Sequence, residues 1–148
     1  MISAEQEEKE IQSIIANALR EDIGSGDHST LACIPKTVRG KVALFVKESG
    51  YISGIEFARQ VFAALSDDID FQINQADGQF ADQGTVVFNV EGPSHILLQA
   101  ERLVLNAMQR MSGITTKTRS YVDCLKGTKT RLLDTRKTTP GIRALEKW

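Results

Sequence analysis

Apolar residues recur with the period of an α-helix in three stretches of the chain. The first stripe lies near the N-terminus, where Ser3 and Gln6 form a predicted capping box; it consists of Ile11, Ile14, Ile15, Ala18 and Leu19. The second stripe starts after Gly54 and consists of Ile55, Ala58, Val61, Phe62 and Leu65. The third stripe starts after Pro93 and consists of Leu97, Ala100, Val104, Ala107, Met108 and Met111. Each stripe predicts a helix with one buried face.

Between these helices the pattern changes to that of β-strands. Residues 41–47 are apolar and β-prone, and Tyr51-Ile52 is the predicted partner of that strand. Phe71 and Ile73 alternate with polar residues, and residues 85–90 predict a further strand. The stretch from 40 to 92 therefore predicts a small, mostly antiparallel sheet with a helix on one face.

The C-terminal third of the chain is punctuated by glycine and proline. Gly113 is predicted to interrupt the third helix, and a separate helix is expected from Ile114 to about Gly127. Residues 130–134 predict a short strand that runs into a polar loop. A final helix is expected with Thr139 as its N-cap and Pro140 at its first position.

Composition places the chain among globular proteins. It has 148 residues, of which 41% are hydrophobic and 25% charged, a size that suits one ordinary domain. The net charge of −1 gives no reason to expect a nucleic-acid partner, and no run approaches the ~20 apolar residues of a membrane span. The N-terminus lacks the apolar segment of a signal peptide, and Cys33 and Cys124 have no metal-type spacing. A reduced, cytoplasmic protein whose thiols are buried or bystanders is predicted.

The small net charge conceals two unlike segments. Residues 1–116 contain 9 basic and 16 acidic side chains, a balance of −7, whereas residues 117–148 contain 9 basic and 3 acidic ones, a balance of +6. A basic segment of this kind either binds an anionic partner or is a solvated helix face.

The candidate chemistry lies in this basic segment. The order strand, polar basic loop, helix start places Arg136, Lys137 and several hydroxyls where α/β proteins bind ligands. Arginine binds a carboxylate or phosphate through two hydrogen bonds, and lysine provides a compact charge. The loop thus predicts a carboxylate or phosphate site, unless both cations only face water. A second cluster, Asp22, Asp27 and His28, resembles metal ligands but is more typical of turn chemistry.

Residues 132–141, Leu-Leu-Asp-Thr-Arg-Lys-Thr-Thr-Pro-Gly, resemble a characteristic motif of the quinolinate phosphoribosyltransferases. Three upstream segments resemble the same family in the same order: residues 18–27, residues 90–93 and residues 101–113. The resemblance implies transfer of a phosphoribosyl group from 5-phosphoribosyl-1-pyrophosphate (PRPP) to quinolinate with decarboxylation. The products are nicotinate mononucleotide, pyrophosphate and CO2, a step of de novo NAD biosynthesis that uses Mg²⁺.

The resemblance also implies roles for individual residues. By position, Arg136 holds a quinolinate carboxylate, and Lys137 lies between quinolinate and PRPP as the catalytic cation. Thr135 contributes to substrate binding through its hydroxyl and backbone. Arg102 is expected to reach the active site of a neighbouring subunit, which implies a homodimer or a higher homo-oligomer, with neither nucleic acid nor membrane as a partner.

The family's members are about twice as long, which sets the expected fold and its limits. The predicted fold class is α+β: residues 1–112 form an antiparallel sheet with packed helices, and residues 113–148 form the first strand and helix start of a truncated α/β barrel. The magnesium ligands are expected in the missing part, so this piece alone is expected to be inactive. Two alternatives stay open: a related type II phosphoribosyltransferase paralogue, or a truncated, non-catalytic dimerisation module.

Overall fold

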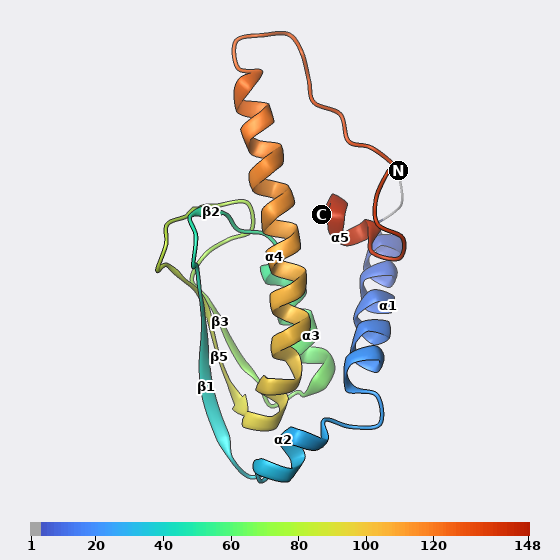
Figure 1. Cartoon of the computed structure of the whole chain (residues 1–148), viewed down its shortest axis with the longest axis vertical. Coiled ribbons are helices and arrows are strands. Elements are labelled where there is room, and N and C mark those ends of the chain that lie inside the picture. The colour runs from blue at the N-terminus through green and yellow to red at the C-terminus, as the bar shows by residue number, and fades with distance from the viewer. Residues whose placement is uncertain (1–3) are drawn as a thin grey trace.

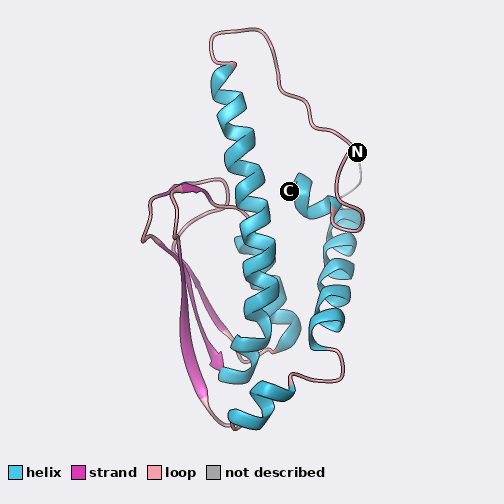
Figure 2. Cartoon of the chain, in the orientation of Figure 1, coloured by secondary structure: helices cyan, strands magenta, loops and turns pink. Residues whose placement is uncertain are grey.

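The computed structural model describes residues 4–148, in which a small antiparallel sheet packs on one side of a long central helix (Figure 1). The helices are α1 (Ala4–Ile23), α2 (His28–Cys33), α3 (Ile55–Leu65), α4 (Ser94–Cys124) and α5 (Arg143–Lys147). The strands are β1 (Arg39–Phe45), β2 (Gly50–Tyr51), β3 (Asp70–Ile73), β4 (Phe80–Ala81) and β5 (Val86–Pro93). Strands and helices thus form separate layers, with α1 on the side of α4 away from the sheet (Figure 2).

The main sheet has the order β1-β5-β3, and both pairings are antiparallel. Val90 of β5 stands opposite Val42 of β1 and Phe71 of β3, so the last strand in sequence is the central one. The predicted antiparallel sheet with a helix on one face is therefore confirmed.

The predicted partner of residues 41–47 is wrong. β2 pairs with β4, where Tyr51 stands opposite Phe80, and not with β1. The chain that follows β1 is already bonded to another segment, because the Val46 amide donates to the Thr85 carbonyl and the Gly84 amide donates to the Val46 carbonyl. Both segments thus pair with residues far away in sequence, and the predicted hairpin between them does not form.

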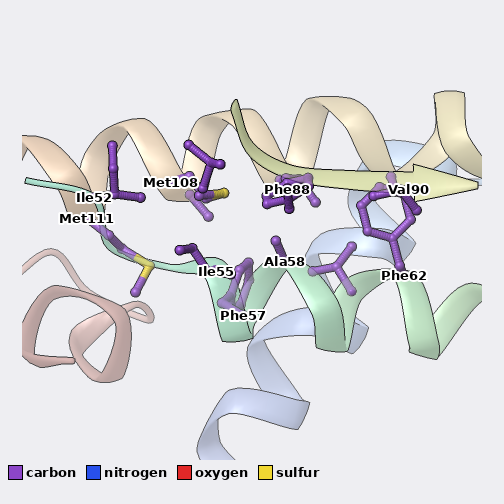
Figure 3. Close-up of a cluster of buried hydrophobic side chains, with 14 of the residues drawn as sticks. Ile52, Ile55, Phe57, Ala58, Phe62, Phe88, Val90, Met108 and Met111 are labelled. Carbon is purple, nitrogen blue, oxygen red and sulfur yellow. The ribbon is translucent and has the colours of Figure 1, made fainter. Parts of the chain in front are cut away.

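The core lies between the sheet and α4, and the third predicted stripe supplies the face of α4 that fills it (Figure 3). The Phe71 ring lies between the rings of Phe62 and Phe88, at centroid distances of 5.8 and 4.6 Å, and Phe57 is also fully buried. Ile11 and Ile15 of α1 are also buried, as the first stripe predicts. The predicted cap Ser3 lies outside the described residues.

Helix α4 continues through Gly113, so the predicted interruption at that residue is wrong. The residues around Gly113 are held by contacts with residues 51–53, at and after the end of β2. The Ser112 hydroxyl accepts a hydrogen bond from the Ser53 amide at 3.0 Å, and the Thr116 hydroxyl accepts one from the Tyr51 amide at 2.9 Å. Tertiary contacts of this kind outweigh the low helix propensity of a single glycine.

Residues 130–134 do not form the predicted strand, and Thr139 does not cap the last helix. Among residues 4–148 no strand lies beside this segment to complete its hydrogen bonds, and Leu133 is 85% exposed. Thr139, Pro140 and Gly141 form a turn, and α5 begins only at Arg143 with Ile142 as its N-cap residue. The described residues contain no closed barrel.

Two smaller features complete the fold. The glycine-rich segment after α1 is a short loop followed by α2, a helix that the sequence pattern does not predict. Cys33 and Cys124 are both exposed free thiols, so the first of the two predicted alternatives, burial, does not hold for either. No helix in residues 4–148 combines the length and the apolarity needed to cross a membrane.

Candidate functional site

The basic motif forms an exposed loop between α4 and α5. After α4 ends, the chain runs back along the molecule toward α1 before α5 begins (Figure 1). Because the loop lacks strand pairing, its position depends on side-chain contacts with the two helices at its ends.

Both ends of the motif are anchored. On its N-terminal side, Lys147 Nζ of α5 donates to Asp134 Oδ2 at 2.6 Å. On its C-terminal side, Arg143 Nε donates to Thr138 Oγ1 at 3.0 Å, and the Thr139 amide donates to Glu146 Oε2 at 2.9 Å. Residues 135–137 therefore lie between two fixed points.

The three predicted site residues of the loop lie between these anchors. The Thr135 hydroxyl accepts a hydrogen bond from the Lys137 amide at 3.2 Å, a local turn that a threonine side chain commonly forms. Within the described part of the chain, the charged ends of Arg136 and Lys137 have no hydrogen-bond or ion-pair partner. The loop thus offers two uncompensated cations to a ligand.

A groove of about 690 Å³ lies between this loop, α4 and α5. Thr135, Lys137 and Thr138 line it from the loop, and Arg119 of α4 and Trp148 line it from other sides. The guanidinium of Arg119 lies 5.5 Å from the centre of the Tyr51 ring, also at the groove. Arg136 is exposed and is not part of the groove wall.

Arg102 is not brought to the loop. It lies on the polar side of α4, with its side chain 73% exposed, and pairs with Asp22 at 2.9 Å. It precedes Arg110, which contacts the loop, by eight residues, or about 12 Å along the helix. The structure therefore brings Thr135, Arg136 and Lys137 together in one loop and leaves Arg102 apart from them.

The glycine-rich cluster that resembled metal ligands serves structural purposes. Asp27 Oδ1 accepts the Thr30 amide at 3.1 Å as the N-cap of α2, and hydrogen bonding by Thr30 lowers the pKa of Asp27. His28 Nε2 lies 3.2 Å from the Ser25 hydroxyl. In residues 4–148 no group of three or more His, Cys, Asp or Glu side chains is arranged to hold a metal ion.

Sequence reasoning missed Arg110 and Glu146. Arg110 Nε donates to Glu146 Oε1 at 2.7 Å, and its Nη2 donates to both Glu146 and the Thr139 hydroxyl. The Glu146 side chain is only 9% exposed. Thirty-six residues separate the pair, so no local spacing in the sequence points to it.

The fold and the loop define a class of protein: an α+β domain whose long helix leads into an exposed loop with two unpaired cations. Cations of this kind are suited to small carboxylates or phosphates.

Comparison with known sequences identifies the family. The family described as quinolinate phosphoribosyl transferase, N-terminal domain, matches residues 27–112, and the C-terminal domain of the same family matches residues 114–148. The chain belongs to the quinolinate phosphoribosyl transferase family.

Individual relatives and a solved structure support the same family. The chain is 42% identical to a probable carboxylating nicotinate-nucleotide pyrophosphorylase of Synechocystis over 130 residues, which are 88% of this chain and 44% of the relative. It is 34% identical to the Bacillus subtilis protein of the same name, over 94% of this chain and 48% of that one. The crystal structure of NadC from Streptococcus pyogenes superposes with a TM-score of 0.89 at 36% identity, covering 99% of this chain and 51% of NadC. The chain thus spans about half the length of the relatives it matches.

Proposed function

We propose that this chain provides the substrate-binding loop and the linking helix of an enzyme that transfers the phosphoribosyl group of PRPP to quinolinate. The reaction forms nicotinate mononucleotide and releases pyrophosphate and CO2. The observation that carries the proposal is the loop at residues 135–137, anchored on both sides and presenting two unpaired cations. Family membership and the names of the relatives support the same chemistry.

The two cations have different tasks. Arg136 binds a carboxylate of quinolinate, because a guanidinium offers two parallel hydrogen bonds to a planar anion. Lys137 is the catalytic residue: its ammonium stabilises negative charge on the pyrophosphate as that group leaves the ribose. The Thr135 hydroxyl assists substrate binding. Departure of pyrophosphate gives an oxocarbenium-like ribose, so positioning and electrostatic stabilisation provide the rate enhancement.

A second subunit completes the site. We propose that Arg102 binds substrate in the active site of a neighbouring subunit of a homodimer or larger homo-oligomer. The exposure of the Arg102 side chain supports this role, because a second subunit can reach it. Its ion pair with Asp22 is a surface pair of the kind that contributes little to stability, so little is lost when Arg102 binds elsewhere. The enzyme is proposed to act in the cytoplasm.

Magnesium is proposed as the cofactor from the family's chemistry alone. The described residues do not fit a complete magnesium site, since they hold no cluster of three acidic or imidazole ligands. No step proposed for this chain depends on the metal. We also expect the 148-residue chain alone not to release pyrophosphate from PRPP, because it spans only about half the length of the relatives it matches.

The test compares Arg136→Ala with Arg131→Ala in the full-length natural protein. Both arginines are exposed in the same loop, and neither has a partner among the described residues. Loss of a two-point carboxylate contact should weaken quinolinate binding by roughly 100-fold in Arg136→Ala. Arg131→Ala should bind normally. Isothermal titration with quinolinate measures both affinities.

Near-normal quinolinate affinity in Arg136→Ala would contradict the assigned role. The same titration with nicotinate, which has one carboxylate fewer, separates the proposed enzyme from a nicotinate-using paralogue. Tighter binding of nicotinate than of quinolinate favours the paralogue.

A further inference from the structure

Arg110 of α4 and Glu146 of α5 bind each other, and both also bind one residue of the loop, Thr139. Arg110 Nε and Nη2 both donate to Glu146 Oε1, the first at 2.7 Å. The second carboxylate oxygen, Oε2, accepts the Thr139 amide at 2.9 Å. Arg110 Nη2 also donates to Thr139 Oγ1 at 2.5 Å. Thr139 is thus held through its backbone and its side chain by two residues that bond each other.

This cluster differs from an ordinary surface ion pair in its burial. The Glu146 side chain is 9% exposed, whereas Arg110 is 47% exposed. By contrast, in the Arg59–Glu56 pair on α3 both side chains are 40% exposed or more. A carboxylate that has lost most of its water must keep its hydrogen bonds, since an unpaired buried charge is costly. Glu146 therefore favours the arrangement in which both of its oxygens keep their donors.

The location of the cluster links it to the loop. Thr139 is two residues beyond Lys137, and Leu145, next to Glu146, is buried in the core at 6% exposure. Met111, next to Arg110, is also buried at 2% exposure. Arg110 and Glu146 thus each lie next to a residue that is buried in the hydrophobic core. Their hydrogen bonds to Thr139 restrain a loop that has no strand partner in the described chain.

We propose that Arg110 and Glu146 are positioning residues, which act through Thr139 to hold the cations of residues 136 and 137 in the geometry that substrate binding requires. This inference rests on the proposed function for its effect on substrate, but the anchoring itself is measurable without any substrate. Neither residue touches quinolinate or PRPP; they act through the loop.

Limited proteolysis with trypsin measures the anchoring in the full natural chain. Trypsin cleaves after Arg136 and Lys137, and cleavage requires the loop to leave its anchored position. Arg110→Ala, Glu146→Gln and Thr139→Val should each accelerate cleavage at these two bonds by roughly tenfold. Arg59→Ala, which breaks the comparable pair on α3, should leave the rate unchanged. Thr139→Val removes one hydroxyl and keeps the side-chain shape, so it tests the proposal even if a charge variant misfolds.

Steady-state kinetics separate positioning from a general loss of structure. Arg110→Ala should raise the KM for quinolinate by roughly tenfold and lower kcat, because the cations no longer meet the substrate in one geometry. Arg110→Lys keeps one donor and should restore part of the effect. Unchanged cleavage and unchanged KM in Arg110→Ala would overturn the proposal while leaving the proposed function intact. Faster cleavage in a protein that binds no quinolinate would support the anchoring and overturn the proposed function.

Discussion

Glu146 carries a carboxylate whose two oxygens accept hydrogen bonds from different parts of the molecule. Hydrogen bonds lower the pKa of Glu146: the largest effect comes from the Thr139 amide, and the next largest comes from the Arg110 guanidinium. Both donors favour the charged form of the carboxylate. The protonation state of this residue is therefore coupled to the position of the loop.

This coupling predicts the pH dependence of the loop. Because the pKa is lower in the folded state than in the unfolded chain, the contribution of Glu146 to stability is fully present above the ordinary glutamate value of about 4.3. It decreases as the pH falls through that value and is lost once the pH passes the lowered pKa of the folded state. NMR titration of the Glu146 carboxyl carbon and the Thr139 amide should give one shared midpoint below the ordinary value. Arg110→Ala should move that midpoint upward; a midpoint at or above the ordinary value in the unmodified protein would refute the coupling.

At the scale of elements, α4 is the central helix, against which both the sheet and the other helices pack. Its buried stripe could be predicted residue by residue, because apolar spacing at the helical period depends only on local sequence. Its passage through Gly113 could not, since the contacts of Ser112 and Thr116 with residues 51–53 are distant in sequence. The partner of β2 was unpredictable for the same reason.

Two glycines that contact α4 or belong to it should respond to alanine in opposite ways. Gly113 lies within α4 with open space around it, so Gly113→Ala should stabilise the chain by roughly 0.5–1 kcal/mol through helix propensity. Gly54 has a φ of +99°, and a Cβ atom there would lie 2.9 Å from Met111 Sδ. Gly54→Ala should therefore destabilise the chain by about 1–3 kcal/mol.

Urea unfolding followed by circular dichroism measures both changes against the unmodified chain. The two variants act as controls for each other, because each replaces a hydrogen atom with the same methyl group. Effects of the same sign would show that α4 does not pass Gly113 as a regular helix, or that the segment at Gly54 is not held against Met111.

At the scale of the whole molecule, the basic C-terminal segment divides into paired and unpaired charges. Lys126 pairs with Asp123, and Lys147 pairs with Asp134, so part of the positive charge is compensated within the chain. Arg136 and Lys137 have no such partner in the described residues. Charge counting located the segment, and resemblance to a family distinguished the two candidate site cations. Neither could reveal the contact of Arg110 with Glu146 and Thr139, because Arg110 precedes the segment in sequence.

The separation of Arg102 from the loop leads to the last prediction, which concerns the assembled enzyme. Suppose that Arg102 binds substrate in the active site of the neighbouring subunit. An Arg102→Ala subunit then still has an intact loop, and a Lys137→Ala subunit still provides an intact Arg102 to its neighbour. Random exchange between the two inactive dimers should therefore restore about one quarter of the sites, namely one site in each mixed dimer. The measurement is pyrophosphate release from PRPP and quinolinate after mixing in the longest natural product of the gene.

A matched control is mixing Arg136→Ala with Lys137→Ala. Both changes lie in the same loop, so every site in a mixed dimer keeps one defect and no activity should return. Subunit exchange is verified by native mass spectrometry of differently tagged subunits. Absence of rescue despite proven exchange would show that Arg102 acts within its own subunit or not at all, and rescue in the control would show that residues 136 and 137 serve different sites. Recovery in the first mixture alone places Arg102 and the loop in one active site built from two chains.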